Sequence, residues 1–126
     1  MNNDTLFFFD KRMNALPLYE ALEREIFAQI PDVKVKVSKT QISFSQEHIF
    51  ALVSFTPCRK AVDRPQNWIT VSFGLNERKA SPRIDVATEP YPGRWTHHVM
   101  VGSCAEIDDE LMRWIREAAV FSAGKR

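Results

Sequence analysis

The two adjacent histidines, His97 and His98, are the residues of this chain whose type most directly suggests chemistry. An imidazole titrates near neutral pH and serves as an acid, a base or a metal ligand. Neighbouring residues of a strand point to opposite faces, so these two side chains cannot hold one metal ion together. We expect His97 to pack in the core with a hydrogen bond to the backbone. We expect His98 to lie on a polar face, either as a ligand contact or as an ordinary surface histidine.

A metal site would need further ligands from elsewhere in the chain. His48 lies next to Glu47 in an expected hairpin turn, and with His98 and a carboxylate it could complete such a site. The spacing of these residues, however, matches no zinc motif or other metal motif. We therefore predict neither a metal ion nor a cofactor.

The two cysteines, Cys58 and Cys104, have neither the spacing of a CxxC motif nor the pattern of a disulfide framework. Arg59 and Lys60 follow Cys58, a setting that can lower the pKa of a thiol, and Cys104 comes just before an expected helix start. Neither cysteine has a general base beside it in the sequence. Ordinary free thiols are the simpler interpretation, and reduced thiols favour a cytoplasmic location.

Basic and aromatic residues of the chain could together recognise an anion such as a phosphate or a carboxylate. Interleaved arginine and aromatic residues also suit a nucleotide base or single-stranded nucleic acid, although they can equally form a solvated sheet face with a packed rim. The 17 Lys and Arg against 16 Asp and Glu leave a formal charge of +1, far from the excess of a general nucleic-acid binder. The candidate ligand contacts are Lys39, Arg64, Trp68, Arg83, Arg94 and His98.

Two segments have the periodicity of amphipathic helices. Apolar side chains recur every four residues over 17–30, where Asn14 is the expected N-cap and Pro31 with Asp32 ends the helix. The same pattern, with acidic residues in the first turn, predicts a second helix over 106–122. The apolar stretch near the N-terminus has only four residues, too few for a signal peptide or a membrane span, so we expect no membrane partner.

The middle of the chain alternates apolar and polar residues, as strands do. Residues 49–55 are apolar at nearly every position, as in a strand covered on both faces. Gly74 and Asn76 mark a turn, and Pro92 with Gly93 suits the centre of a type II turn. The expected strands are 33–38, 40–46, 49–55, 67–73, 83–87 (a short edge strand) and 95–101.

These elements predict a single α+β domain over residues 1–126: an antiparallel sheet of about five or six strands, with the N- and C-terminal helices packed on one face. The other face is then partly open. Alternation assigns the side chains to the two faces. The helix-facing set includes Val35, Ile42, Phe44, Val71, Phe73, Val99 and Val101, and the opposite set includes Lys36, Ser43, Trp68, Thr70, Ser72, Thr96, His98 and Met100.

Several stretches, in one uninterrupted order, resemble the bacterial family known as domain of unknown function fifty-six fifty-five. The resemblance runs from about Leu6 to Phe121, and "PGRWTHHV" and "VSKTQISF" are its most specific parts. That family is similar in turn to the YdhG-like domains, whose fold resembles the two-layer sandwich of frataxin and some of which are described as iron chaperones. Shared architecture does not transfer function, and this chain lacks an acidic ridge along its first helix. The family has no established catalytic residues to carry over. The matching stretches are "LPLYEAL", "VKVSKTQISF", "ITVSFGL", "SPRIDV", "EPYPGRWTHHV" and "EIDDELMRWIREAA".

Three functions fit these observations. The first is a non-catalytic cytoplasmic binding module whose open sheet face receives a small anionic ligand, a nucleotide or a protein segment. The second is a small enzyme for a phosphorylated or acyl substrate, with His98 as acid or base and Arg94 holding the anion. The third is a homodimer formed through residues 6–9 or through the open face, with Trp68 and Met100 buried between subunits.

Overall fold

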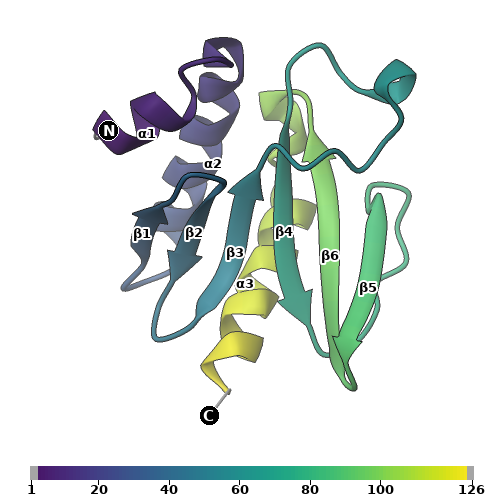
Figure 1. Ribbon diagram of the computed structural model, residues 1–126. Helices are drawn as coiled ribbons and strands as arrows, with labels where there is room; N and C mark the ends of the chain where they lie inside the picture. Colours follow the sequence, from purple (N-terminus) through teal and green to yellow (C-terminus); the bar gives the residue numbers. More distant parts are fainter. Residues whose placement is uncertain (1–2, 125–126) are drawn as a thin grey trace.

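The computed structural model of the protein describes residues 3–124 (Figure 1). Two long helices and six strands dominate it, in the expected order of helix, strands, helix. A short helix that the sequence pattern does not predict precedes them. In chain order the elements are α1 (Asn3–Phe8), η1 (Met13–Ala15), α2 (Leu16–Gln29), β1 (Lys34–Val37), β2 (Gln41–Ser45), β3 (Ile49–Ser54), η2 (Ala61–Asp63), β4 (Ile69–Leu75), β5 (Val86–Tyr91), β6 (Arg94–Val101), η3 (Cys104–Glu106) and α3 (Asp109–Ala123).

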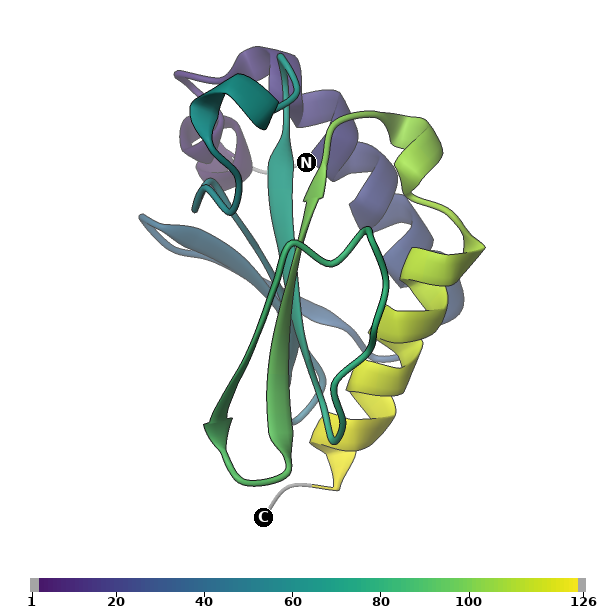
Figure 2. The same cartoon turned by 90° about the vertical axis from the view of Figure 1, so that its right-hand side faces the viewer.

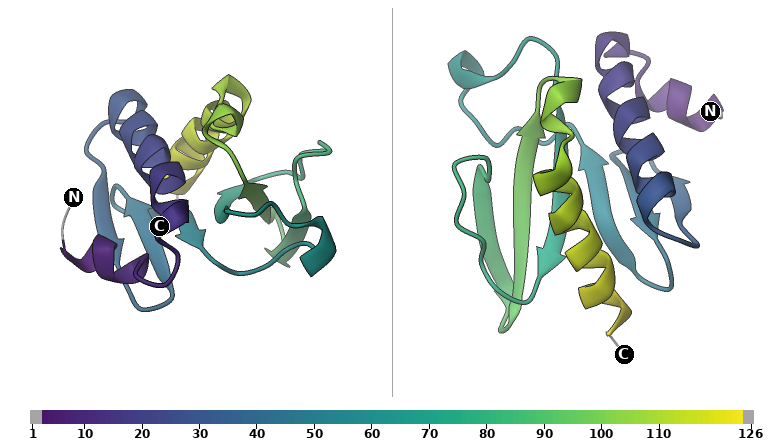
Figure 3. Two further views of the ribbon diagram at one scale, coloured as in Figure 1. Left: turned by 90° about the horizontal axis from the view of Figure 1, so that it is seen from above. Right: turned by 180° about the vertical axis from the view of Figure 1, so that it is seen from behind.

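The six strands of the described chain form one antiparallel sheet in the order β1-β2-β3-β4-β6-β5. Helices α2 and α3 lie side by side on one face of this sheet (Figures 2 and 3). This arrangement confirms the α+β architecture with both helices on one face. We call the face opposite α2 and α3 the open face. The last two strands cross over, since β6 and not β5 is the neighbour of β4.

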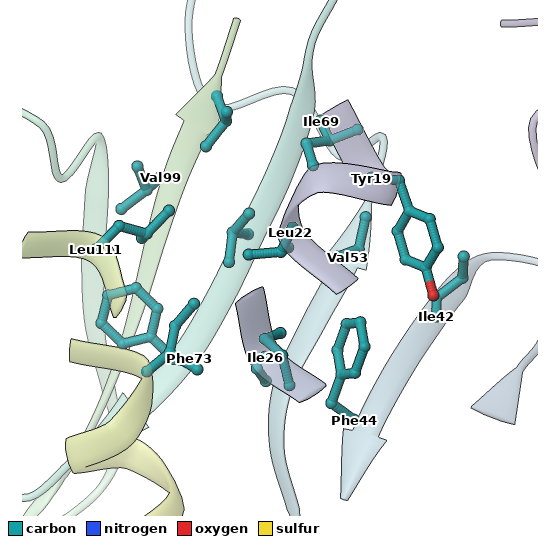
Figure 4. Packing of buried hydrophobic residues seen from close by; sticks show 14 of the residues in the cluster. Tyr19, Leu22, Ile26, Ile42, Phe44, Val53, Ile69, Phe73, Val99 and Leu111 are labelled. Atoms are coloured by element: carbon teal, nitrogen blue, oxygen red, sulfur yellow. The ribbon is translucent and has the colours of Figure 1, made fainter. Parts of the chain in front are cut away.

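Buried side chains of α2, α3 and the helix-facing strand positions form one core (Figure 4). Leu22 and Ile26 of α2 are fully buried, as the four-residue period predicts. Tyr19 stacks on Phe44 with 6.1 Å between ring centroids, which joins α2 to β2. Each large apolar side chain buried in this way contributes about 1.5–3 kcal/mol to folding. The core therefore determines which face of β2, β3, β4 and β6 remains outside.

The start of α2 differs from the sequence prediction. Asn14 lies inside η1, and the N-cap is Ala15, whose side chain makes no capping bond, so Asn14 as the cap is wrong. The 3-10 turn leads directly into the helix and leaves no extended residue at which a cap could form. The end of α2 is as expected, because Ile30 leaves the helix and Asp32 adopts a left-handed φ of 57°.

The apolar stretch near the N-terminus is used within the chain. It forms α1, which lies beside the β1–β2 hairpin (Figure 1). The ring of Phe9 is fully buried, 5.4 Å from the ring of Tyr19 and 5.5 Å from that of Phe55. Phe7, in contrast, is 83% exposed. Only part of this stretch is thus free to meet another molecule.

Three strand predictions need correction. Edge strand β5 covers Val86–Tyr91 and not residues 83–87, because a turn closed by the bond from Ile84 N–H to Ser81 C=O delays its start. Gly74 lies within β4 and does not mark a turn. Strand β3 is not covered on both faces, since its Leu52 is only half-buried on the open face. The predicted turn at Pro92 and Gly93 is confirmed, with φ of 77° at the glycine.

His97 is a core residue, as expected. It is fully buried and stacks on Phe73 with 5.4 Å between ring centroids. Its Nε2 accepts a hydrogen bond of 3.0 Å from the backbone N–H of Lys79. Burial lowers the pKa of His97, so the imidazole is held neutral.

Candidate functional site

A small cavity opens where strands β3 and β4 separate. Their paired residues end at Ala51 and Phe73, although both strands continue, whereas β4 stays paired with β6 up to Leu75 (Figure 1). The space left between the strand ends is about 110 Å³. Phe50 and Ser122 also border it. The open-face residues that line it are Leu52, Ser72, Gly74, Arg94 and Thr96.

The Arg94 side chain lies over Gly74 on the open face. Thr96 pairs with Gly74 in the β4–β6 ladder, so Arg94 reaches Gly74 along the diagonal between the two strands. A Cβ atom added to Gly74 would lie 3.4 Å from the Arg94 Nη2 and 3.5 Å from its Cζ. The missing side chain at Gly74 therefore gives the guanidinium its place against the sheet.

Ser72 and His98 form a hydrogen-bonded pair beside this cavity. They are directly opposite in the β4–β6 ladder, and the Ser72 Oγ lies 2.7 Å from the His98 Nδ1. Ser72 is only 5% exposed, and its hydroxyl has no other acceptor among residues 3–124. The hydroxyl donates to Nδ1 in the Nε2–H tautomer of His98 and accepts from Nδ1–H in the other tautomer. In either tautomer this bond holds the imidazole ring on the open face.

The protonation state of His98 agrees with this hydrogen bond. Burial lowers the pKa of His98, because a half-buried imidazolium loses hydration. Protonation would make both ring nitrogens donors, so that Nδ1 could only donate to the Ser72 hydroxyl. At neutral pH the pair is uncharged, and the formal positive charge of the cavity comes from Arg94.

The upper part of the open face is covered by the connection between β3 and β4 (Figure 2). The Thr70 hydroxyl donates to the Thr56 carbonyl at 2.7 Å, and the Arg59 Nε donates to Asp85 Oδ1, also at 2.7 Å. Met100 is fully buried beneath this connection and is not free to join a subunit interface. The β3–β4 connection thus covers the open face around Thr70 and Met100 and does not line the cavity.

Cys58 lies in the same connection, and it is not an activated thiol. Burial and the nearby Asp85 carboxylate raise the pKa of Cys58, and these effects outweigh the lowering by Thr70 and Arg59. Arg59 does lower the pKa of Cys58, as the sequence suggests, but its effect is smaller than that of burial and Asp85, and Arg59 is itself paired with Asp85 at 2.7 Å.

Arg83 lies against the start of α3 and does not line the cavity. Its Nη1 is 2.7 Å from Asp108 Oδ1 and 3.1 Å from Glu110 Oε1. Its Nη2 donates to the Glu106 carbonyl, and its guanidinium lies over the Trp114 ring. These contacts use the guanidinium to attach the β4–β5 connection to the start of α3.

The other predicted ligand contacts are dispersed. Lys39 is exposed in the β1–β2 turn, and Arg64 donates to the Arg59 carbonyl at 2.8 Å. Trp68 lies at the entry to β4, where the Arg12 guanidinium stands 5.4 Å from its ring. A separate polar hollow of about 410 Å³ lies beside Trp68 and the α1–α2 connection. Of the six candidates, only Arg94 and His98 share a strand and a face, since both lie on the open face of β6 with Thr96 between them.

Of the residues that line the cavity, only Arg94 was a predicted contact; the polar or small open-face residues that the prediction missed are Ser72, Gly74 and Thr96. Alternation places Ser72 and Thr96 on the polar face, but only the β4–β6 register brings Ser72 opposite His98. The glycine within an otherwise regular strand pattern was the available signal, because such a glycine often marks a close approach of another group.

The part of the chain that the structure describes contains no cluster of three or more potential metal ligands. Within residues 3–124, no helix combines the length and apolar character needed to cross a bilayer.

Comparison with known proteins identifies a family. The family model described as "Domain of unknown function (DUF5655)" matches residues 7–122, which is nearly the whole chain. The chain belongs to this family. No curated protein and no solved structure matches it significantly. The resemblance found from the sequence is thereby confirmed at family level, and the more distant likeness to YdhG-like domains stays a prediction.

Proposed function

We propose that this DUF5655 protein is a binding module whose open face takes up a small anionic ligand at Arg94. The observation that carries the proposal is that Arg94, unlike the other half-buried basic residues, has no polar partner in the described part of the chain. Five Lys or Arg side chains within residues 3–124 are half-buried. Arg59, Arg64, Lys79 and Arg83 each have a polar partner in the chain, whereas the Arg94 guanidinium has neither an ion pair nor a hydrogen bond there.

A partly buried guanidinium without a partner in the chain keeps its five N–H donors available for an anion. The surroundings of Arg94 suit such an anion, because hydroxyl and imidazole groups lie beside the cavity and no carboxylate lines it. The volume of about 110 Å³ is well below the roughly 300–1,000 Å³ of typical ligand pockets. This size favours a small anion, or the anionic end of a larger molecule or protein segment, over an enclosed nucleotide.

The test is a thermal-shift screen against carboxylates, phosphates, sulfate and nucleotides at constant ionic strength. A ligand at one hundred times its dissociation constant stabilises the folded state by about 2.7 kcal/mol. We expect stabilisation by at least one anion class, lost in Arg94→Ala and kept in Arg113→Ala, which removes an exposed arginine of α3. Equal stabilisation of both variants would refute the placement, and no stabilisation by any anion would refute the function.

A second candidate function is an enzyme acting on a phosphorylated or acyl substrate. The observation that favours it is the 2.7 Å bond between Ser72 Oγ and His98 Nδ1, in which the imidazole is placed to take the hydroxyl proton. Activated esters and phosphate esters of nitrophenol would reveal turnover. Activity lost in both Ser72→Ala and His98→Gln supports catalysis, whereas activity that survives either change removes it.

We further propose a cytoplasmic location, because Cys58 and Cys104 are free thiols. Self-association through α1 is a separate proposal that rests on the exposed Phe7, since Met100 and Phe9 are already buried within the chain. Light scattering at high concentration would test it, and a monomer in both the wild type and Phe7→Ser would remove it.

A further inference from the structure

We infer that the ligand of the Arg94 cavity is a small monocarboxylate with a short apolar tail. This inference rests on the proposed function, and it assigns the chemical class of the anion. It depends on three properties of the cavity: its single cation, the apolar residues on the side opposite Arg94, and its size.

The charge of the cavity matches one negative charge. Arg94 is the only charged residue that lines it, and the planar guanidinium pairs with the two oxygens of a carboxylate through parallel hydrogen bonds. The Ser72 hydroxyl is already used by His98. A second negative charge, as on a phosphate monoester, would meet no second cation among these lining residues and would remain uncompensated.

The apolar side of the cavity lies across β4 from Arg94. Strand β4 separates β3 from β6 in the sheet, so Arg94 and the lining residues of β3 stand on opposite sides of Gly74. Those β3 residues include Ile49 and Leu52, which are not fully buried and offer apolar surface to a ligand. A carboxylate bound to Arg94 therefore directs the rest of its molecule toward apolar side chains.

The cavity has room for a short tail. Its volume is about 110 Å³. An acid between acetate and butyrate in size fits this space. Each methylene that enters the apolar part should tighten binding by about fourfold, from a transfer free energy of about 0.8 kcal/mol per buried methylene.

The test is a titration of the ¹⁵N-labelled protein, at constant ionic strength, with acetate, propionate, butyrate, butyramide and inorganic phosphate. We expect butyrate to bind with a dissociation constant of about 1 mM and to displace the amide resonances around Gly74 and Thr96. Affinity should rise with chain length, and butyramide and phosphate should bind at least about tenfold more weakly.

Three variants separate the contributions of charge, space and apolar contact. Arg94→Ala should abolish binding of every acid. Gly74→Val should do the same without changing the net charge, because its side chain takes the place of the guanidinium. Leu52→Thr should bind acetate as the wild type does, but its affinity should no longer increase from acetate to butyrate. Arg113→Ala is the control for charge and should bind as the wild type does.

The outcomes distinguish this inference from the function on which it rests. Phosphate binding as tightly as butyrate, and depending on Arg94, would overturn the carboxylate assignment and leave an anion-binding module. Butyramide binding as tightly as butyrate would overturn it as well, because the charge would then be irrelevant. No Arg94-dependent binding of any anion would overturn both proposals.

Discussion

Replacing Arg83 with alanine should destabilise the protein while leaving the Arg94 cavity intact. The Arg83 guanidinium contacts the side chains of Asp108 and Glu110 and the carbonyl of Glu106, and it lies over the ring of Trp114. Asp108 is also the N-cap of α3, since its Oδ1 accepts the Leu111 N–H at 3.0 Å. The substitution therefore removes the contacts that hold Asp108, the N-cap residue of α3, in position.

The expected loss of stability depends on how exposed the side chains paired with Arg83 are. The Arg83 side chain is 22% exposed, but those of Asp108 and Glu110 are 45% and 42% exposed, so each ion pair is worth at most about 1 kcal/mol. The hydrogen bond to the Glu106 carbonyl adds about 1 kcal/mol, and the contact with Trp114 adds about 0.5 kcal/mol. We expect a total loss of about 2–3 kcal/mol.

Urea denaturation of Arg83→Ala, Arg83→Lys and Arg113→Ala measures this loss. Lysine keeps the charge but cannot reach three acceptors with a rigid fork, so it should recover less than half of the lost free energy of unfolding. Arg113 has no ion pair or side-chain hydrogen bond within residues 3–124, and its removal should change stability by less than about 0.5 kcal/mol. A loss for Arg83→Ala no larger than that of the control would refute the reasoning.

Three further predictions concern titration and the backbone. Burial lowers the pKa of His97, so its contribution to stability should be complete above about pH 6.5, the pKa of histidine in the unfolded chain, and should decrease as the pH falls below that value. His97→Phe should weaken this dependence of the unfolding free energy on pH, as measured by denaturation at a series of pH values. Asp108 affects stability at lower pH. Burial alone would raise its pKa, but the hydrogen bonds from Leu111 and Arg83 lower it overall. The free energy of unfolding should therefore decrease again in the acidic range where carboxylates titrate, and this decrease should be smaller in Arg83→Ala. Gly102→Ala should cost about 1–3 kcal/mol, because its Cβ would lie 2.5 Å from the Pro65 ring, whereas Gly124→Ala, with its nearest contact at 3.5 Å, should be nearly neutral in thermal unfolding.

Alternation in the sequence predicts the faces of this sheet well, because burial against α2 and α3 requires apolar side chains at every second position. Ile42, Phe44 and Val71 are fully buried as expected, and His97 and His98 lie on opposite faces. The same reasoning cannot predict the strand order. Strand β4 pairs with β6 and not with β5, the next strand in the sequence. No local sequence pattern indicates which of the two strands β4 will pair with.

The candidate site was predictable only in part for the same reason. Arg94 and His98 share one strand, so alternation alone places them on one face. Ser72 joins them through the β4–β6 register, and Gly74 makes room for Arg94 through a diagonal contact. Arg83, like Arg94, follows a turn residue in the sequence, yet its partners lie in η3 and at the start of α3, 23 to 27 residues later in the chain. Such partners depend on tertiary packing and are not visible in a single sequence.

Binding and catalysis make different demands on the hydrogen bond between Ser72 and His98. A nucleophilic serine must reach a substrate atom, and its base is usually held by a third group. Ser72 is only 5% exposed, and no carboxylate within residues 3–124 bonds to the Nε2 of His98. An anion site needs less, because the unpaired guanidinium of Arg94 can bind an anion without any transfer of a proton. The geometry of this face therefore favours recognition of an anion over its chemical conversion.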